Sequence, residues 1–220
     1  MKKLMKKVAL VLVAVMALGL LGGCGQKFDA SAYLKAILDN SYKNDSTAFV
    51  ELKIGTAEEA AALYEEGIET ELQGLVASAE ISEEQGAQFR EVLADMLGGV
   101  KYTVGEAEKQ DDDSYIVTIT YEQMNVFGPT VETYMADIEA MATAWAESGE
   151  YPSDEEMNEA ILESLKNCLA ETLKNVTYDE AATTTVKIEL VDNVYTPVEA
   201  DLYNLEYVLF DLEELMNMGF

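Results

Sequence analysis

The chain has 220 residues, and its 42 Asp and Glu residues outnumber its 14 Lys and Arg residues, giving a formal net charge of −28 at pH 7. So few cations argue against binding to nucleic acid, whose phosphates are contacted by clustered Lys and Arg. Histidine is absent, which excludes Ser-His-Asp and Cys-His catalysis and histidine metal sites. The acidity has two interpretations, plain solubility or a basic or divalent-cation partner, and the sequence leaves both open.

The first 24 residues have the order of an export signal. Lysines at positions 2, 3, 6 and 7 precede an apolar run of 16 residues from Val8 to Gly23. This run is short for a transmembrane helix, which needs about 20 residues, and closer to the apolar region of a signal peptide, at about 7–15. The closing residues Leu21-Gly22-Gly23-Cys24 resemble the lipobox of bacterial lipoproteins, in which the cysteine thiol receives a diacylglycerol and becomes residue one after cleavage.

These residues predict a signal peptide over 1–23, lipid attachment at Cys24, a short tether over 24–28 and a single extracytoplasmic domain over 29–220. Two alternatives stay open: an ordinary signal peptide cut near Gly22, with Cys24 incidental, and an uncleaved anchor. Without the four signal lysines, 10 of the 14 basic residues remain against 42 acidic residues, a formal charge of −32. Because anionic lipids attract Lys and Arg rather than acids, we expect two acyl chains alone to hold this domain at the membrane.

Capping signals place most of the predicted helices. Asp29 is the expected N-cap of the first helix, and residues 44–46 end it. Gly98-Gly99 is the expected stop of a later helix. Three capping boxes are predicted from a Ser or Thr followed three positions later by Glu or Gln: Thr56 with Glu59, Ser82 with Gln85, and Ser153 with Glu156.

Two helices of the second half are predicted from apolar residues at helical spacing. One is opened by residues 128–130, and its expected buried side is formed by Val131, Tyr134, Met135, Ile138, Met141, Ala142 and Trp145. The last helix of the chain has apolar residues at spacings of 3 and 4: Leu202, Leu205, Leu209, Leu212 and Met216.

Two stretches change to a period of two, which predicts β-hairpins. In the first, residues 100–104 and 115–121 alternate around a turn at Asp111-Asp112-Asp113-Ser114. In the second, residues 186–190 lead into a turn at Asp192-Asn193, and residues 194–197 return. The chain is thus predicted to be an α+β protein, with several amphipathic helices packed on a small antiparallel sheet.

A weak internal repeat relates residues 93–102 to residues 169–178, at an offset of 76 positions. Each copy carries the end of a helix into a strand. Two αα-ββ halves, over residues 29–127 and 128–220, would then share one sheet. Chance similarity between two helix-to-strand junctions explains the likeness equally well.

Three segments carry a resemblance to a known family: residues 29–45 (DASAYLKAILDNSYKND), residues 56–71 (TAEEAAALYEEGIETE) and the hairpin opening KYTVGEAEK over residues 101–109. They resemble uncharacterised acidic lipoproteins of clostridial-type Gram-positive bacteria, and the likeness of pattern covers most of the chain after Cys24. The resemblance implies a lipid anchor on the extracytoplasmic face of the cell membrane and an acidic α+β domain. It implies no activity and adds no catalytic residue.

The sequence offers little catalytic material, and we assign no catalytic, cofactor-binding or metal-ligating residue. Cys168 has no histidine partner and lies on an apolar stripe, so it is interpreted as a small core residue. The run Asp111-Asp112-Asp113 lacks the alternation of an EF-hand loop and is interpreted as a solvated turn, with weak calcium binding as the alternative. Adjacent glutamates on helices point in different directions and form no facing pairs: Glu58-Glu59, Glu65-Glu66, Glu83-Glu84, Glu155-Glu156 and Glu213-Glu214.

Aromatic residues leave a binding role open. Tyr102, Tyr115 and Tyr121 share one predicted hairpin face, where they form either core or a ligand-holding concavity. The last helix has a second apolar side that is either buried or a docking surface for a membrane partner: Tyr203, Tyr207 and Phe210.

The main hypothesis is a non-enzymatic, lipid-anchored extracytoplasmic module for binding or interaction, without a cofactor and with a membrane or cell-envelope protein as partner. The alternative is a small cell-surface hydrolase that uses paired carboxylates. Two carboxylates that face each other across a cleft would favour the hydrolase. An apolar groove or patch without such a pair would favour the binding module. The sequence determines neither the ligand nor the oligomeric state.

Overall fold

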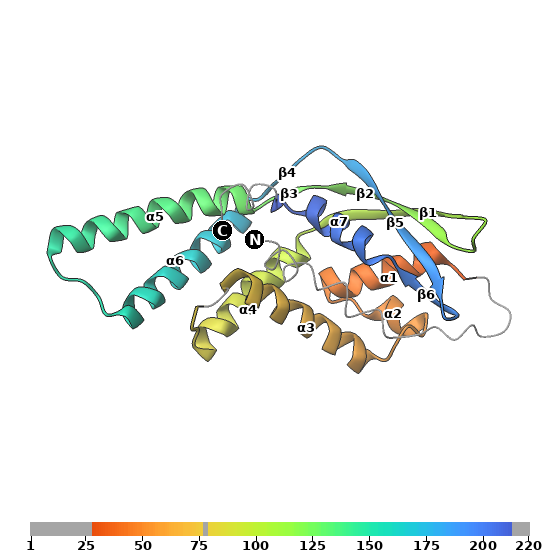
Figure 1. The fold of residues 1–220 in the computed structure, drawn as a ribbon, viewed down its shortest axis with the longest axis horizontal. Helices are drawn as coiled ribbons and strands as arrows, with labels where there is room; N and C mark the ends of the chain where they lie inside the picture. The colour runs from red at the N-terminus through yellow and green to blue at the C-terminus, as the bar shows by residue number, and fades with distance from the viewer. Residues whose placement is uncertain (1–27, 77–78, 213–220) are drawn as a thin grey trace.

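The computed structural model of the chain describes residues 28–76 and 79–212, drawn in colour in Figure 1. The predicted signal peptide, Cys24 and Met216 lie outside these residues. Helices and a small antiparallel sheet make up the described part, which confirms the α+β prediction. None of the described helices is both long and apolar enough to cross a membrane.

The elements follow one another along the chain as two helix-rich stretches, each leading into strands. The described helices are α1 (Ala30–Lys43), α2 (Thr47–Glu51), α3 (Ala57–Val76), α4 (Glu83–Gly98), α5 (Phe127–Ser148), α6 (Asp154–Lys174) and α7 (Glu199–Leu209). The described strands are β1 (Lys101–Lys109), β2 (Tyr115–Glu122), β3 (Met124–Asn125), β4 (Thr177–Tyr178), β5 (Ala182–Val191) and β6 (Val194–Pro197). The sequence predicted neither α2 nor β3, whereas β4 lies where the repeat predicted a strand at the end of residues 169–178.

The helix starts follow the predicted capping signals. The Asp29 carboxylate accepts a hydrogen bond of 2.9 Å from the backbone N–H of Ala32, as an N-cap does. All three predicted capping boxes are formed, each with a backbone N–H donating to the Ser or Thr hydroxyl and another to the Glu or Gln side chain. Local side chain–backbone bonds therefore determine where α3, α4 and α6 begin.

The larger sheet has the strand order β1-β2-β5-β6, and all neighbouring strands are antiparallel. Tyr115 at the start of β2 pairs with Ile188 near the end of β5, so the turn at residues 110–114 and the turn at Asp192-Asn193 lie at the same end of the sheet. We call this the turn end. Both predicted turns are confirmed, and Asp192 and Asn193 have positive φ angles of 50° and 66°, which suits a two-residue hairpin turn.

One hairpin from each predicted half contributes to this sheet, because β2 and β5 pair at its centre. The strand order by itself does not relate the two halves by a repeat. The half-repeat over residues 29–127 and 128–220 stays a prediction.

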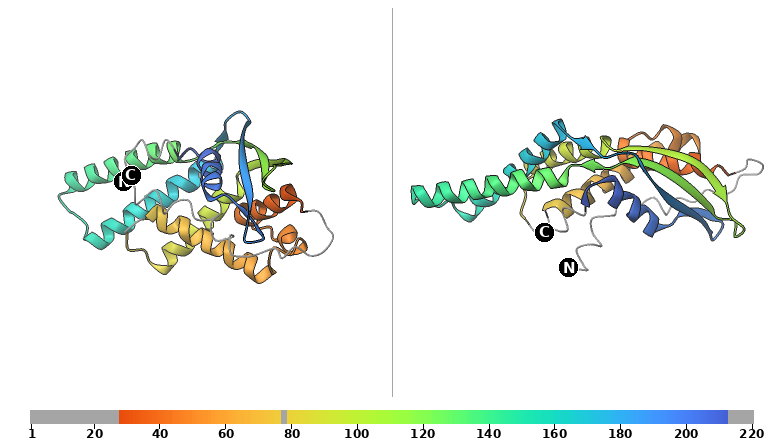
Figure 2. Two further views of the ribbon diagram at one scale, coloured as in Figure 1. Left: turned by 45° about the vertical axis from the view of Figure 1, so that its right-hand side comes forward. Right: turned by 90° about the horizontal axis from the view of Figure 1, so that it is seen from above.

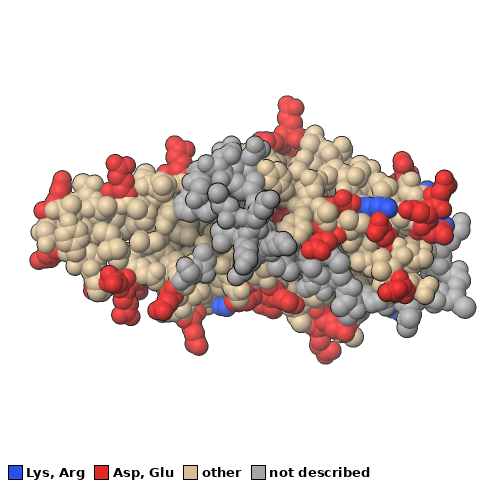
Figure 3. Space-filling view, viewed as in Figure 1, with Lys and Arg blue, Asp and Glu red and all other residues tan. Residues whose placement is uncertain are grey.

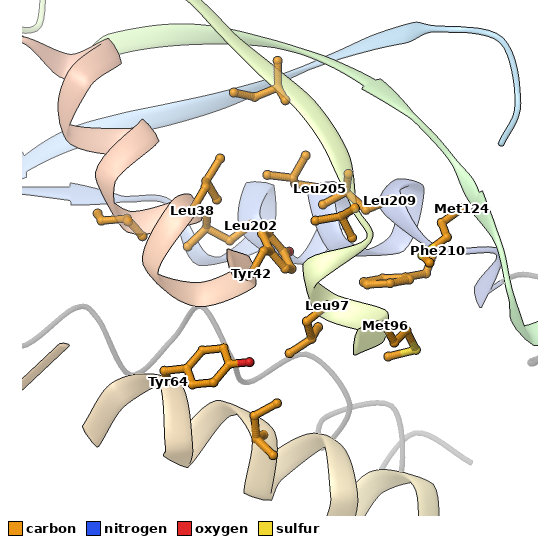
Figure 4. Close-up of a cluster of buried hydrophobic side chains, with 14 of the residues drawn as sticks. Leu38, Tyr42, Tyr64, Met96, Leu97, Met124, Leu202, Leu205, Leu209 and Phe210 are labelled. Carbon is orange, nitrogen blue, oxygen red and sulfur yellow. The ribbon is translucent and has the colours of Figure 1, made fainter. Parts of the chain in front are cut away.

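Helix α1 is central to the hydrophobic core. It contacts β1 and β2 on one side and α3 and α4 on the other, and its Leu34, Ile37, Leu38 and Tyr42 are fully buried. Helix α7 packs on β5, and its leucines meet Leu38, Tyr42 and Leu97 in one cluster (Figure 4). Each fully buried Leu or Ile side chain contributes about 1.5–3 kcal/mol, so this cluster accounts for much of the stability.

Helices α5 and α6 form a two-helix arm that extends beyond the rest of the fold (Figures 1 and 2). The first turn of α5 is buried through Phe127, Thr130 and Val131. Further along, Met135 is 54 % exposed and Ala142 is exposed, so the predicted burial of these two residues was wrong. The reason is that α6 is the main partner of α5 there, and one helix covers only one side of another. The remaining members of the predicted stripe are half-buried: Tyr134, Ile138, Met141 and Trp145.

Helix α7 is shorter than the leucine spacing predicts. It ends at Leu209, and Phe210 is extended, with φ −117° and ψ 155°. Phe210 forms an isolated parallel bridge with Met124 and is 2 % exposed. The predicted continuation of the helix through Phe210 was therefore wrong, because pairing with β3 replaces the helical turn. Phe210 is buried rather than part of a docking surface.

Candidate functional site

Cys168 is a buried core residue, as predicted. Its side chain lies on α6 and is 4 % exposed. Its Sγ is 3.5 Å from Asp137 Oδ2, and Ser164 is its other polar neighbour. Burial raises the pKa of the Cys168 thiol, and the negative charge of Asp137 adds to that shift. The thiol therefore stays protonated at neutral pH and is a poor nucleophile.

Asp112 and Asp113, two of the three aspartates in the turn at residues 110–114, interact with neighbouring protein groups. Asp112 Oδ1 accepts hydrogen bonds from the backbone N–H and the hydroxyl of Ser114, and Asp112 Oδ2 lies 3.4 Å from Lys187 Nζ. Asp113 Oδ1 lies 2.6 Å from Lys109 Nζ. In the part of the chain that the structure describes, no three Cys, Asp or Glu side chains are grouped so as to hold a metal ion. All three aspartates are exposed in the turn between β1 and β2, as the interpretation of a solvated turn expects, and weak calcium binding stays an untested alternative.

The adjacent glutamates predicted to form no facing pairs are exposed on α3, α4 and α6. Glu213-Glu214 lies outside the described residues. A different pair does face inward, and the sequence reasoning missed it. Glu71 on α3 and Glu206 on α7 are 9 % and 3 % exposed, and their carboxyl groups lie close enough to shift each other's pKa.

Burial makes this carboxyl pair hard to ionise. Desolvation raises the pKa of Glu71 to about 7 and the pKa of Glu206 well above its ordinary range, and the negative charge of Glu71 raises the pKa of Glu206 further. Two carboxylates held together in an apolar surrounding cannot both carry a charge cheaply, so they share a proton near neutral pH. The fully buried Tyr42 of α1 lies close enough for both glutamates to raise the pKa of its hydroxyl, after burial itself.

The pair has the chemistry of a hydrolase dyad without the access that one needs. Glu71 Oε1, Glu206 Oε2 and the Tyr42 hydroxyl are buried and have no hydrogen-bond partner in the structure. Two cavities on the surface lie beside Phe28 and where α4 and α6 end. Neither Glu71 nor Glu206 lines either of them. A glycosidase pair must admit a sugar and a water molecule between its carboxyl groups. The Glu71–Glu206 pair instead links α3 to α7 inside the core.

A helical-wheel signal for this pair was present in the sequence. Glu71 falls on the same apolar stripe as Ile68 and Leu72, and Glu206 falls between Leu202 and Leu209. A charged residue on the buried face of an amphipathic helix indicates a buried polar contact. The sequence did not show that Glu71 and Glu206 are partners, because 135 positions separate them.

A surface groove lies where α4 and α6 end and β3 and β4 pair. It has a volume of about 590 Å³ and a mostly apolar lining, with Asp95 and Lys174 as its charged members. The apolar and aromatic lining residues come from both halves of the chain: Val92, Ala94, Gly98, Gly99, Met124, Ala170, Leu173, Val176 and Tyr178. A Cβ placed on Gly98 would meet no atom within 4 Å, because this residue borders open space. The volume falls within the range of about 300–1,000 Å³ that is typical of small-molecule sites.

Tyr178 fixes one wall of this groove. Its hydroxyl donates a hydrogen bond of 2.8 Å to the backbone carbonyl of Gly99, and Lys101 Nζ lies 3.6 Å from its ring centroid. These contacts hold β4 against the junction between α4 and β1. No facing carboxylate pair lines the groove.

The comparisons with known proteins concern the fold. No protein-family model matches the chain, and no curated protein matches it. Among solved structures, the chain is similar to YcdA from Bacillus subtilis, a presumed lipoprotein, with a TM-score of 0.56 and 14 % sequence identity. The match covers 82 % of this chain and 55 % of YcdA, so the chain spans about half the length of that protein. At this identity, the likeness establishes a shared fold and no more.

Proposed function

We propose that this protein is a lipid-anchored binding module on the extracytoplasmic face of the cell membrane, held there by a diacylglycerol on Cys24. The lysine-rich start, the short apolar run and the lipobox-like residues 21–24 support the anchor. The fold likeness to a presumed lipoprotein agrees with it. The finer assignment to acidic lipoproteins of clostridial-type Gram-positive bacteria belongs to the same proposal.

The groove at the junction of α4 and α6 carries the binding part of the proposal. It combines an open apolar lining with one carboxylate and one ammonium group, Asp95 and Lys174. Such a site suits an apolar ligand, or an apolar side chain of a membrane or cell-envelope protein, that carries a polar group at one end. The alternative hydrolase is not proposed, because the facing carboxyl pair Glu71–Glu206 is closed off in the core.

The anchor is tested by comparing the two cysteines. Cys24→Ala removes the proposed lipid attachment, and Cys168→Ala is the matched control, since it also removes one thiol. We expect the Cys24→Ala protein to leave the membrane fraction and the control to remain there. Membrane association of a Cys24→Ala chain from which the signal peptide has been cleaved would refute the proposal.

The groove is tested with the neutral apolar fluorophore N-phenyl-1-naphthylamine and the lipid-free chain of residues 25–220. Ala170→Trp places a large ring in the groove lining, and Ala140→Trp makes the same change on the exposed side of α5. We expect the fluorescence increase of the probe to be lost with Ala170→Trp and kept with Ala140→Trp. Equal binding by both variants would contradict binding in the groove.

A further inference from the structure

We infer that the domain stands on the bilayer with the turn end of its sheet toward the lipid and the α5–α6 arm pointing away from it. This orientation rests on the proposed lipid attachment at Cys24. Its structural basis is the aromatic cluster that holds Phe28, together with the position of that cluster relative to the arm. The partner of the turn end is thus a lipid surface, and the arm and the groove are left to meet other molecules.

Phe28 is held by three tyrosines. Its ring stacks on Tyr195 with a centroid distance of 3.8 Å and an interplanar angle of 7°, and it meets Tyr115 edge-on at 5.5 Å. Tyr33 packs on it at 5.3 Å and donates a hydrogen bond of 2.9 Å to the backbone carbonyl of Tyr195. We call Phe28, Tyr33, Tyr115 and Tyr195 the aromatic clamp. It fixes the point at which the chain enters the domain.

The clamp lies at the turn end of the sheet. Tyr115 is the first residue of β2, directly after the turn at residues 110–114. Tyr195 pairs with Leu190, one step from the turn at Asp192-Asn193. Lys187 Nζ lies 3.4 Å from Asp112 Oδ2 and joins the second hairpin to the turn of the first. The entry point of the chain and both turns therefore share one end of the domain.

The length of the tether keeps the lipid close to this end. Four peptide units separate Cys24 from Phe28, and a fully extended chain spans at most about 3.3–3.6 Å per residue. The Cα atom of Cys24 is therefore within about 14 Å of the Cα atom of Phe28, whatever path the tether takes. A tether this short keeps the aromatic clamp, and with it the turn end, near the bilayer surface.

The arm begins at the other end of the sheet. Strand β2 runs away from the turn end, and the chain passes through β3 directly into α5. Helix α5 has 22 residues, which at 1.5 Å per residue is about 33 Å of helix. The views in Figures 1 and 2 agree that the tip of the arm and the start of α1 lie at opposite ends of the molecule.

Charge does not distinguish the two ends, because the turn end also carries an excess of acidic residues, Asp111, Asp112 and Asp113 among them. Residues 127–174 contain 11 Asp and Glu residues, and Lys166 and Lys174 are their only basic residues. In Figure 3 the outer part of the arm shows acidic side chains and no basic ones on the visible face. An anionic bilayer surface repels both ends, so the orientation rests on the short tether and the aromatic clamp.

Energy transfer to the bilayer tests this orientation in the full lipid-modified protein. The protein is bound to phosphatidylcholine vesicles that contain a headgroup-labelled acceptor lipid. A donor dye is attached at Asp111→Cys in the turn end or at Tyr151→Cys at the arm tip, each in a Cys168→Ala background. Both positions are exposed, and Tyr151 is 70 % exposed. We expect several-fold higher transfer from position 111 than from position 151, and equal or reversed values would overturn the orientation.

Clamp variants connect the result to Phe28. Phe28→Ala removes the stacked ring and is expected to shrink the difference between the two positions, while Phe28→Tyr keeps the stacking and the difference. Circular dichroism checks that each variant is folded. A difference that survives Phe28→Ala would overturn the role of the clamp. Protein that fails to float with the vesicles would refute the lipid anchor itself, whereas floating protein with equal transfer from both positions would refute only the orientation.

Discussion

The carboxylate of Asp211 accepts a hydrogen bond of 2.7 Å from the backbone N–H of Phe127, 84 positions earlier in the chain. The same carboxylate accepts from the N–H groups of Val126 at 2.9 Å and Gly128 at 2.7 Å. Asp211 is 6 % exposed. A side chain from the C-terminal segment thus caps the start of α5, where N–H groups have no partner within the helix and the helix dipole favours a negative charge.

Asp211→Ala should destabilise the protein by about 2–3 kcal/mol, because two buried N–H groups and one partly buried N–H group lose a charged acceptor. The exposed turn residue Asp111→Ala is the matched control, with an expected effect within about 0.5 kcal/mol. Urea unfolding followed by circular dichroism measures both values. Equal stability of the two variants would show that the cap is not formed in solution.

Stability should fall as pH rises because of Glu71 and Glu206. An ordinary glutamate has a pKa of about 4.3 in an unfolded chain, and burial raises the pKa of Glu71 in the folded state to about 7. Between these values the folded protein binds more protons than the unfolded chain, so the free energy of unfolding decreases with pH. The stabilising contribution is complete below about pH 4 and is lost as pH rises through about 7.

Glu206→Gln should remove much of this pH dependence. The amide donates a hydrogen bond to Glu71 without a shared proton, so the variant should exceed the wild type in stability by about 1–2 kcal/mol at pH 8. Glu65→Gln, on the exposed side of α3, is the control. Thermal unfolding between pH 5 and pH 8 measures the slopes, and an unchanged slope in Glu206→Gln would contradict the shared proton.

The arm should tolerate changes at Met135 but not at Val131. Val131 is 5 % exposed and Met135 is 54 % exposed, although both belong to the apolar stripe read from the sequence. Val131→Ala should cost about 1–3 kcal/mol, and Met135→Ala should change the stability by no more than about 0.5 kcal/mol. Chemical unfolding of both variants decides this. A large loss with Met135→Ala would mean that α5 is covered in solution.

Gly98 and Gly99 should respond oppositely to alanine. A Cβ on Gly98 meets nothing within 4 Å, so Gly98→Ala should stabilise the end of α4 by about 0.5–1 kcal/mol. A Cβ on Gly99 would lie 2.8 Å from Met124 Cε and 3.3 Å from the carbonyl oxygen of Met96. Gly99→Ala should therefore be less stable than Gly98→Ala, because the buried Met124 must move. The same ranking should appear in melting temperatures, and the reverse order would contradict the packing of Met124 on this turn.

Local signals account for the parts of the fold that the sequence predicted. Capping boxes, the Asp29 cap and the two turns each depend on residues within four positions of one another, and all of them form. The Asp211 cap and the Glu71–Glu206 pair join residues more than 80 positions apart, so periodicity could not find their partners. The stripe of α5 was misread for a related reason, since an apolar pattern shows which side of a helix can be buried and not whether a neighbour is present.

The arm also has a consequence for dynamics. Beyond Val131, α5 is packed mainly on α6 and has no residue in the buried core. Its outer turns can therefore open without unfolding α1 or the sheet. Backbone amides near Gly149 should therefore exchange with deuterium long before those of the central strands. The tip of the arm, which lies farthest from the sheet, is expected to unfold locally while the core stays folded.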